Sequence, residues 1–178
     1  AANGDMEEIF SWAQDTLSDE GLAKLAALPK LKILRLHSKR ITDRGVQELA
    51  GLTKIEEFFT GGELTEKSLD VAQQWLQLRE VGLRLDHISA ANMKRLCQLP
   101  RLERLRLDVP CGDEEVAQLR SHPTLTELDL PRATVTERSL PILRSLPKLR
   151  YAMLSGDSGD PVSKKVAATV NAEIEARK

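Results

Sequence analysis

A unit of about two dozen residues recurs six times along the chain, and this tandem repeat limits the possible folds more than any other feature. In the first copy, apolar residues recur at steps of three and then at a final step of two: Leu22, Leu25, Leu28, Leu31, Leu34 and Leu36. Steps of three are typical of one face of a helix, whereas a step of two is typical of a strand. The later copies start, at spacings of 23 or 24 residues, at Val46, Leu69, Met93, Val116 and Leu140. Such a regular array predicts equivalent helix–strand units stacked side by side.

A second pattern, in phase with the first, marks the expected start of each helix. A small residue, usually bearing a hydroxyl, occupies this point in each copy: Ser18, Thr42, Thr65, Ser89, Gly112 and Thr136. An acid usually comes next, at Asp19, Asp43, Glu66, Asp113 and Glu137. A hydroxyl at the N-cap satisfies a free backbone N–H, and an acid favours the positive end of a helix. Leu-Pro corners, which predict where a helix stops, recur at Pro29, Pro100 and Pro147.

The chain resembles the leucine-rich-repeat superfamily, most closely its helix-bearing classes, such as ribonuclease-inhibitor-like, F-box-associated and related bacterial repeat proteins. The resemblance covers about residues 17–156 and is carried by the stretches LSDEGLAKLAALPKLKILRL, ITDRGVQELAGLTKIEEF and VTERSLPILRSLPKLRYAML. The period also lies within the range of about 20–29 residues that is typical of this superfamily. The resemblance implies a right-handed α/β solenoid of about six repeats, with a parallel sheet on the concave face and helices on the convex face.

The sequence departs from the family pattern in two places. The Asn that usually follows the last strand Leu by three residues is replaced by Lys39, Asp86, Pro110 and Ala133. We therefore expect the corner after each strand to use another hydrogen-bonding solution. The second copy is also weak, because Thr60 stands at its last apolar position and Gly61-Gly62 follow. This composition predicts a local irregularity.

Both ends of a repeat stack expose apolar surface, so we expect a capping helix at each end. The first lies within residues 1–16, where Met6, Ile9, Phe10 and Trp12 stand among acids. The second lies within residues 157–178, where Asp160 and Pro161 form an N-cap and N1 pair. Its apolar face consists of residues at steps of four: Val162, Val166, Val170 and Ile174. The alternative is that these helices bind a partner or adjoin neighbouring domains.

Function is expected on the concave face, because repeat solenoids bind through extended concave surfaces. Residues that alternate with the inward leucines of each strand point outward on this face. The predicted partner-binding residues are Ile33, Arg35, His37, Glu57, Phe59, Glu80, Arg84, Arg104, Arg106, Asp108, Glu127, Asp129, Tyr151 and Met153. Gly61, Gly82, Pro131 and Ser155 occupy outward positions in the same strands.

The predicted face is bipolar in charge and carries large apolar anchors. Its arginines lie near the start and middle of the sheet, and Asp108, Glu127 and Asp129 lie on later strands. Phe59 and Tyr151 are expected to be exposed, and arginine and aromatic residues are enriched at interface hot spots. The alternative is an ordinary solvated surface, because surface charges usually contribute little.

The sequence argues against several other classes of function. The net charge of −1 offers no bulk basic surplus for nucleic acid, and no apolar run approaches the roughly 18–20 residues that span a bilayer. Cys97 and Cys111 have neither disulfide-scaffold nor metal spacing. The histidines belong to different repeats, and His122 stands where other copies have Leu or Trp. No catalytic motif is present, so neither an enzyme nor a metal or other cofactor is expected.

The sequence therefore predicts a protein–protein interaction module, either monomeric or part of a larger complex. A reducing, cytoplasmic setting is favoured by the two scattered cysteines. The resemblance admits two narrower versions, which are a substrate-recognition adaptor of a ubiquitin-ligase-type assembly and a bacterial effector. A structural or assembly subunit that uses its convex helices and caps is the alternative from another class.

Overall fold

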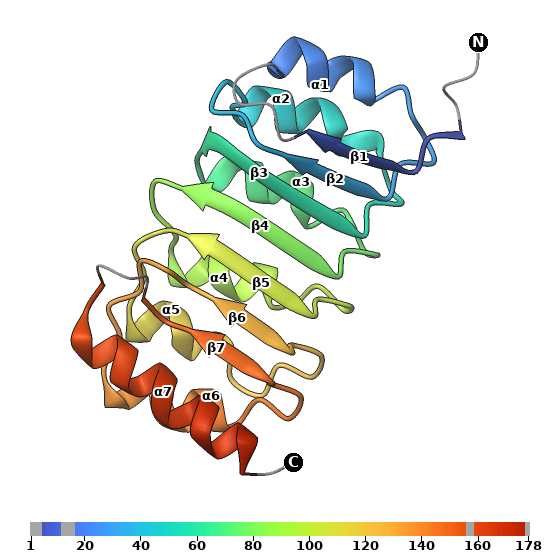
Figure 1. Ribbon diagram of the computed structural model, residues 1–178. Helices are drawn as coiled ribbons and strands as arrows, with labels where there is room; N and C mark the ends of the chain where they lie inside the picture. The colour runs from blue at the N-terminus through green and yellow to red at the C-terminus, as the bar shows by residue number, and fades with distance from the viewer. Residues whose placement is uncertain (1–4, 12–16, 156–158, 177–178) are drawn as a thin grey trace.

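The computed structural model describes residues 5–11, 17–155 and 159–176 and has an α/β architecture. Seven strands form one sheet in which every neighbouring pair is parallel. The strands lie in chain order, from β1 at one edge to β7 at the other (Figure 1). Each connection between consecutive strands contains a helix, so helix and strand alternate as the repeat predicts.

The elements follow the repeat closely. The strands are β1 (Glu8–Ser11), β2 (Ile33–Leu36), β3 (Glu57–Leu64), β4 (Glu80–Leu85), β5 (Arg104–Asp108), β6 (Glu127–Asp129) and β7 (Tyr151–Met153). The α-helices are α1 (Asp19–Leu25), α2 (Asp43–Glu48), α3 (Leu69–Ala72), α4 (Ala90–Leu96), α5 (Asp113–Ala117), α6 (Leu140–Arg144) and α7 (Pro161–Glu175). Short 3-10 turns cover Leu49–Gly51, Glu66–Ser68 and Glu137–Ser139.

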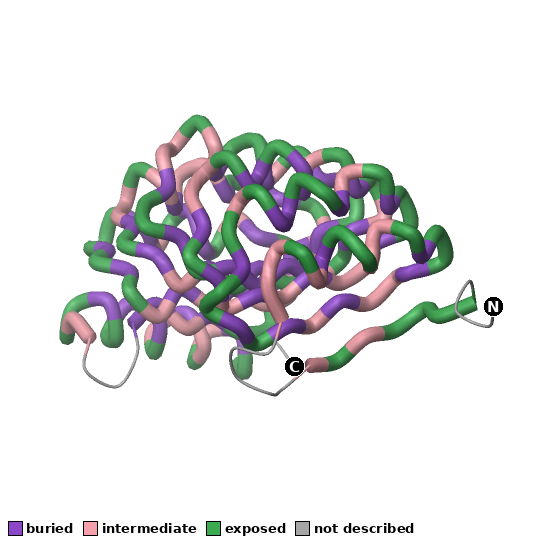
Figure 2. Tube along the Cα trace, turned by 90° about the horizontal axis from the view of Figure 1, so that it is seen from above, coloured by how far each residue is buried: buried purple, intermediate pink, exposed green. Residues whose placement is uncertain are grey.

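The core is a layer of side chains between the helices and one face of the sheet. Helices α1–α6 lie on the same side of the sheet (Figure 1), and the buried residues gather in the interior between the two layers (Figure 2). The strand leucines predicted to point inward, such as Leu34 and Leu105, are buried. Trp75 packs edge-on against Phe58, with their ring centroids 5.0 Å apart. Aliphatic side chains supply most of the remaining core.

The N-terminal segment differs from the prediction. A capping helix was expected within residues 1–16, but Glu8–Ser11 form strand β1, and the part after Ser11 lies outside the described residues. The backbone N–H groups of Lys32 and Ile33 both donate to the carbonyl of Glu7, at 2.8 and 3.0 Å. A strand in this place satisfies the backbone groups along the edge of β2, which a helix would leave without sheet partners. The sheet therefore has one strand more than the six repeats predict.

The irregularity expected in the second repeat lies in β3. The pairing of β3 with β4 shifts register between Thr60 and Leu64. The hydroxyl of Thr60, which is buried in a leucine position, accepts a hydrogen bond from the N–H of Gly62 at 3.2 Å. A Cβ atom at Gly62 would lie 2.3 Å from the carbonyl oxygen of Ile41, so only glycine allows this close approach of the two chains.

The predicted C-terminal helix is confirmed as α7, which ends the array beside β7 (Figure 1). The carboxylate of Asp160 caps it by accepting from the N–H of Ser163 at 2.7 Å. Its buried apolar residues are Val166, Ala167, Val170 and Ile174. The prediction is wrong for Val162, which is 45% exposed, because the first turn of α7 directs this residue away from the neighbouring repeat.

Helix α7 also closes the free edge of the sheet. The side-chain amide of Asn171 pairs with the backbone of Ala152 in β7. It donates to the carbonyl oxygen at 2.8 Å and accepts from the N–H at 2.9 Å. One side chain thus takes the place of a neighbouring strand and blocks further strand pairing at this point.

A column of carboxylates links the starts of successive helices, and it is called the carboxylate ladder below. In four repeats, the acid after the N-cap accepts hydrogen bonds from both the backbone N–H and the hydroxyl of the N-cap residue in the next repeat. The pairs are Asp19–Thr42, Asp43–Thr65, Glu66–Ser89 and Asp113–Thr136. These acids therefore connect repeats, beyond the helix-end effect expected from the sequence.

Candidate functional site

One face of the sheet has no described helix over it (Figure 1), and it is called the open face below. The strand register arranges its side chains in rows across the sheet. The first row is Glu8, Ile33, Glu57, Glu80, Arg104, Glu127 and Tyr151. The second is Phe10, Arg35, Phe59, Gly82, Arg106, Asp129 and Met153. Beyond the second row lie His37, Gly61, Arg84 and Asp108. The structure thus brings all the predicted partner-binding residues onto one face.

A chain of ion pairs joins Arg35 of the second row to the charged residues of the first row. The guanidinium of Arg35 lies 2.6 Å from the carboxylate of Glu57 and 3.0 Å from that of Glu80. Arg104 contacts the other oxygen of Glu80 at 2.6 Å and also lies 3.1 Å from Glu127. Five strands, from β2 to β6, are therefore connected by ion pairs, which fixes the positions of these long side chains.

Glu80 lies at the centre of this chain and is the least exposed of its acids, with a side chain that is 13% accessible. Burial raises the pKa of Glu80, and the negative charge of Glu57 raises it further. The two arginine partners, Arg104 and Arg35, lower the pKa, but they do not offset the other effects. The ion pairs with Arg35 and Arg104 stabilise the charged form of Glu80, which partial burial disfavours.

An aromatic stack lies at the start of the second row. The guanidinium of Arg35 sits over the ring of Phe59, 4.5 Å from its centroid. The same ring covers Gly82 on the next strand, where a Cβ atom would lie 2.1 Å from the ring. Gly82 was predicted to be an outward position and is buried, because Phe59 occupies the space of its missing side chain.

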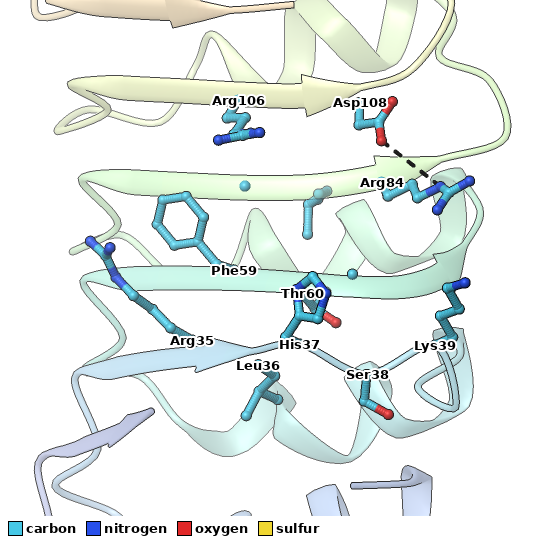
Figure 3. A pocket seen from close by; sticks show the side chains of 13 residues that line it. Arg35, Leu36, His37, Ser38, Lys39, Phe59, Thr60, Arg84, Arg106 and Asp108 are labelled. Carbon is cyan, nitrogen blue, oxygen red and sulfur yellow. Dashed lines mark ion pairs between the residues drawn. The ribbon is translucent and has the colours of Figure 1, made fainter. Parts of the chain in front are cut away.

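A hollow of about 440 Å³ opens on this face between β2 and β5 (Figure 3). The ring of Phe59 and the side chains of Arg35 and Arg106 lie on one part of its rim, and His37 lies across from them. Its basic members are Arg35, His37, Lys39, Arg84 and Arg106, and Asp108 is its one carboxylate among the described residues. The hollow is a concave part of the predicted surface and is rich in donors.

The predicted basic and acidic regions are joined to each other by ion pairs. Arg106 on β5 pairs with Asp129 on β6 at 3.3 Å, and Arg84 on β4 lies 3.9 Å from Asp108 on β5. Together with the chain along the first row, these pairs mix the two signs across the whole sheet. Parallel pairing places side chains of successive repeats directly beside each other, so charges separated by one repeat become neighbours.

Two exposed aromatic residues lie near opposite edges of the open face. Tyr151 on β7 is 50% exposed, as predicted. Phe10 on β1 is 48% exposed, and sequence reasoning placed it in a helix. Polar and apolar residues do not alternate through Glu8, Ile9, Phe10 and Ser11, so the period of two gives no strand signal here. Ser155, predicted to point outward, is buried instead.

The cysteines and His122 lie away from the open face, in buried or partly buried positions. Cys97 and Cys111 are free thiols, and burial raises the pKa of each to about 12, so neither is a ready nucleophile. His122 is buried, and its Nδ1 atom accepts from the N–H of Leu125 at 3.2 Å. Within the described ranges, no group of three metal-binding side chains is found, and no helix is long and apolar enough to cross a membrane.

In comparisons with known proteins, no family model and no curated protein matches the chain. The open face must therefore be interpreted from its own geometry and from the repeat.

Proposed function

We propose that this chain is a leucine-rich-repeat solenoid of the helix-bearing type that recognises another protein through its open face. Seven adjacent parallel strands with helices packed on one side support the repeat architecture. The observation that carries the functional proposal is the composition of the uncovered side. It presents arginines, paired acids and partly exposed aromatic rings over six repeats without an intervening helix. Extended surfaces of this kind are what repeat proteins use to bind partners.

The chemistry of the open face favours recognition over catalysis. Its carboxylates are held by arginines, and Phe10 and Tyr151 offer rigid apolar area. Aromatic and arginine side chains contribute most of the binding free energy at many protein interfaces. A partner that covered these side chains would bury apolar area and add few unsatisfied charges, because the ion pairs already exist on the free surface.

Affinity purification with quantitative mass spectrometry tests this proposal. Wild-type chain, Phe10→Ala and Tyr151→Ala serve as baits, and Leu76→Ala is the matched control. Leu76 is 60% exposed and lies in the segment after α3, outside the rows of the open face. We expect a partner that Leu76→Ala retains and at least one aromatic variant loses. Equal recovery with every bait would contradict binding through this face.

The alternative of an assembly subunit makes a different prediction. Helix α7 exposes Val162 on its first turn, and a self-associating chain would bury such surface between copies. Light scattering after size-exclusion chromatography would then show an oligomer that Val162→Glu dissociates. A monomer at high concentration argues for the recognition role. The identity of a captured partner would separate an adaptor of a ligase-type assembly from a bacterial effector.

A further inference from the structure

The hollow on the open face has a floor unlike the rest of the sheet. Gly61 contributes no side chain, and a Cβ atom placed there would come no closer than 3.8 Å to the ring of His37. Gly82 is covered by Phe59, so the aromatic ring forms an apolar wall beside the open space. The volume of about 440 Å³ lies within the range of about 300–1,000 Å³ that is typical of ligand sites. The hollow can hold a side chain or two of a bound polypeptide.

The lining of this space carries more basic than acidic side chains. Glu57 and Glu80 lie outside the lining, although both contact Arg35, which lines it. Within the lining, Asp108 is the only acid that the structure describes. Arg35, Arg84 and Arg106 each have an acid partner on a neighbouring strand, so what distinguishes the hollow is the number of its N–H donors.

Arg84 on β4 and Arg106 on β5 retain donors for a ligand. Arg106 approaches Asp129 through its Nε atom at 3.3 Å, and Arg84 approaches Asp108 through its Nε atom at 3.9 Å. A guanidinium has five N–H donors, so these contacts leave terminal nitrogens able to meet a further acceptor. Both side chains are well exposed, at 60% and 55%. Charge-assisted hydrogen bonds from arginine to a carboxylate are among the strongest that such donors make.

Resting on the proposed function, we infer that the hollow receives an acidic side chain from an extended segment of the partner protein. The carboxylate of a Glu or Asp accepts hydrogen bonds from Arg106 or Arg84, and the adjoining carbon atoms pack on Phe59. A nucleic acid fits this surface less well. Its successive phosphates would lie against the carboxylates of Glu80 and Asp129, which flank the hollow.

Selection from a display library of short random peptides on the immobilised full chain tests this inference. We expect the selected peptides to share an acidic position, and we expect their binding to weaken as salt rises. Replacing that acidic residue by its amide should weaken binding about tenfold, which corresponds to about 1.4 kcal/mol. Arg106→Gln or Arg84→Gln should produce a similar loss, whereas Arg120→Gln should not, because Arg120 follows α5 on the helical side.

A double-mutant cycle gives the decisive measurement. If the acidic residue contacts the arginine whose replacement weakens binding, replacing both should cost less than the sum of the two single changes. Additive losses, selected peptides without an acid, no selected peptide, or preferential binding of a single-stranded oligonucleotide would each overturn the inference. The proposed function and the inference about the hollow can be tested separately. A partner that depends on Tyr151 but on neither Arg106 nor Arg84 would leave the open face as the interface and remove the hollow from it.

Discussion

The carboxylate ladder makes a quantitative prediction at Asp113. Its carboxylate accepts from the N–H and hydroxyl of Thr136 at 2.9 and 2.6 Å, and from the hydroxyl of Ser139 at 2.6 Å. Asp113→Ala removes all three contacts. Thr136 is exposed and can turn to water, whereas Ser139 is 1% exposed and would keep an unsatisfied hydroxyl. Hydrogen bonds to charged groups contribute about 1.5–3 kcal/mol, and a buried unsatisfied group costs about 1–3 kcal/mol. We therefore expect a loss of about 2–4 kcal/mol.

Thermal unfolding followed by circular dichroism measures this loss. For a chain of this size, each kcal/mol lowers Tm by about 2–4 °C, so the predicted decrease is about 4–16 °C. Glu114→Ala is the matched control, because Glu114 is an exposed acid in the same first turn of α5. It removes only the interaction with the helix dipole, worth about 0.3–1 kcal/mol. If Asp113→Ala and Glu114→Ala lowered Tm equally, the hydrogen bonds of Asp113 to the next repeat would contribute no stability beyond the interaction with the helix dipole.

The stabilisation that Asp113 provides through these hydrogen bonds should depend on pH in a defined direction. Burial by itself would raise the pKa of Asp113, but hydrogen bonds from Ser139 and Thr136 outweigh it, so the pKa lies below its usual value. A carboxyl whose pKa is lower in the folded state stabilises the fold above its unfolded pKa, which is about 3.9. That contribution disappears as the pH falls through the folded pKa. The difference in Tm between wild type and Asp113→Ala should therefore shrink in acid.

Three further predictions follow from single contacts. Asn171→Ala should lower the free energy of unfolding by about 2–4 kcal/mol in urea titrations, since both backbone groups of Ala152 lose their partner, and Asn171→Asp should not restore it, because a carboxylate oxygen would then face the carbonyl oxygen of Ala152. Gly82→Ala should cost about 1–3 kcal/mol by expelling the ring of Phe59, and the cost should fall in a Phe59→Ala background; an unchanged cost would exclude this clash. Burial lowers the pKa of His122, so the stability that depends on its neutral form is lost as the pH falls through that pKa. His122→Leu should flatten the decline of Tm between pH 7 and pH 5, and a parallel decline in both proteins would contradict this assignment.

The alternation of helices and strands could be predicted because each repeat encodes it locally. Steps of three and two place Leu22 on a helix and Leu34 on a strand, and both are buried. The N-caps at Thr42 and Thr136 also follow from residue type, and each hydroxyl accepts the expected backbone N–H. These features depend on neighbours within one repeat, which a sequence displays directly.

The N-terminal strand could not be predicted in this way. The segment around Phe10 lies outside the repeat template, and its mixture of apolar and acidic residues also suits an amphipathic helix. Its conformation is decided by the exposed edge of β2, whose N–H groups need an acceptor such as the carbonyl of Glu7. That need arises only after the sheet has formed, so tertiary context outweighs local pattern here.

The side-chain contacts of the candidate site also depend on tertiary structure and could not be predicted from the repeat alone. Outward positions such as Arg35 and Glu80 follow from the period of two, but their partners depend on which strands become neighbours. Arg35 reaches past Glu57 to Glu80, two strands away, and this contact joins residues 45 positions apart in the chain. The hollow likewise depends on a ring from β3 lying over a glycine of β4. A template of separate repeats contains no information on such diagonal contacts.

The one gap in the carboxylate ladder explains why the repeat tolerates variation at its helix starts. The fourth repeat has Ala90 where others carry an acid, and the fifth has Gly112 where others carry a hydroxyl. Between the fourth and fifth repeats, both the acceptor carboxylate and the donor hydroxyl are therefore missing. The N–H of Gly112 instead donates to the carboxylate of Glu115 in its own helix at 2.8 Å. A backbone donor at a helix start requires an acceptor, and the preceding repeat or the same turn can supply it. From Thr42 to Thr136, the backbone N–H at each of these helix starts therefore has a carboxylate acceptor, although the residue that supplies it differs between repeats.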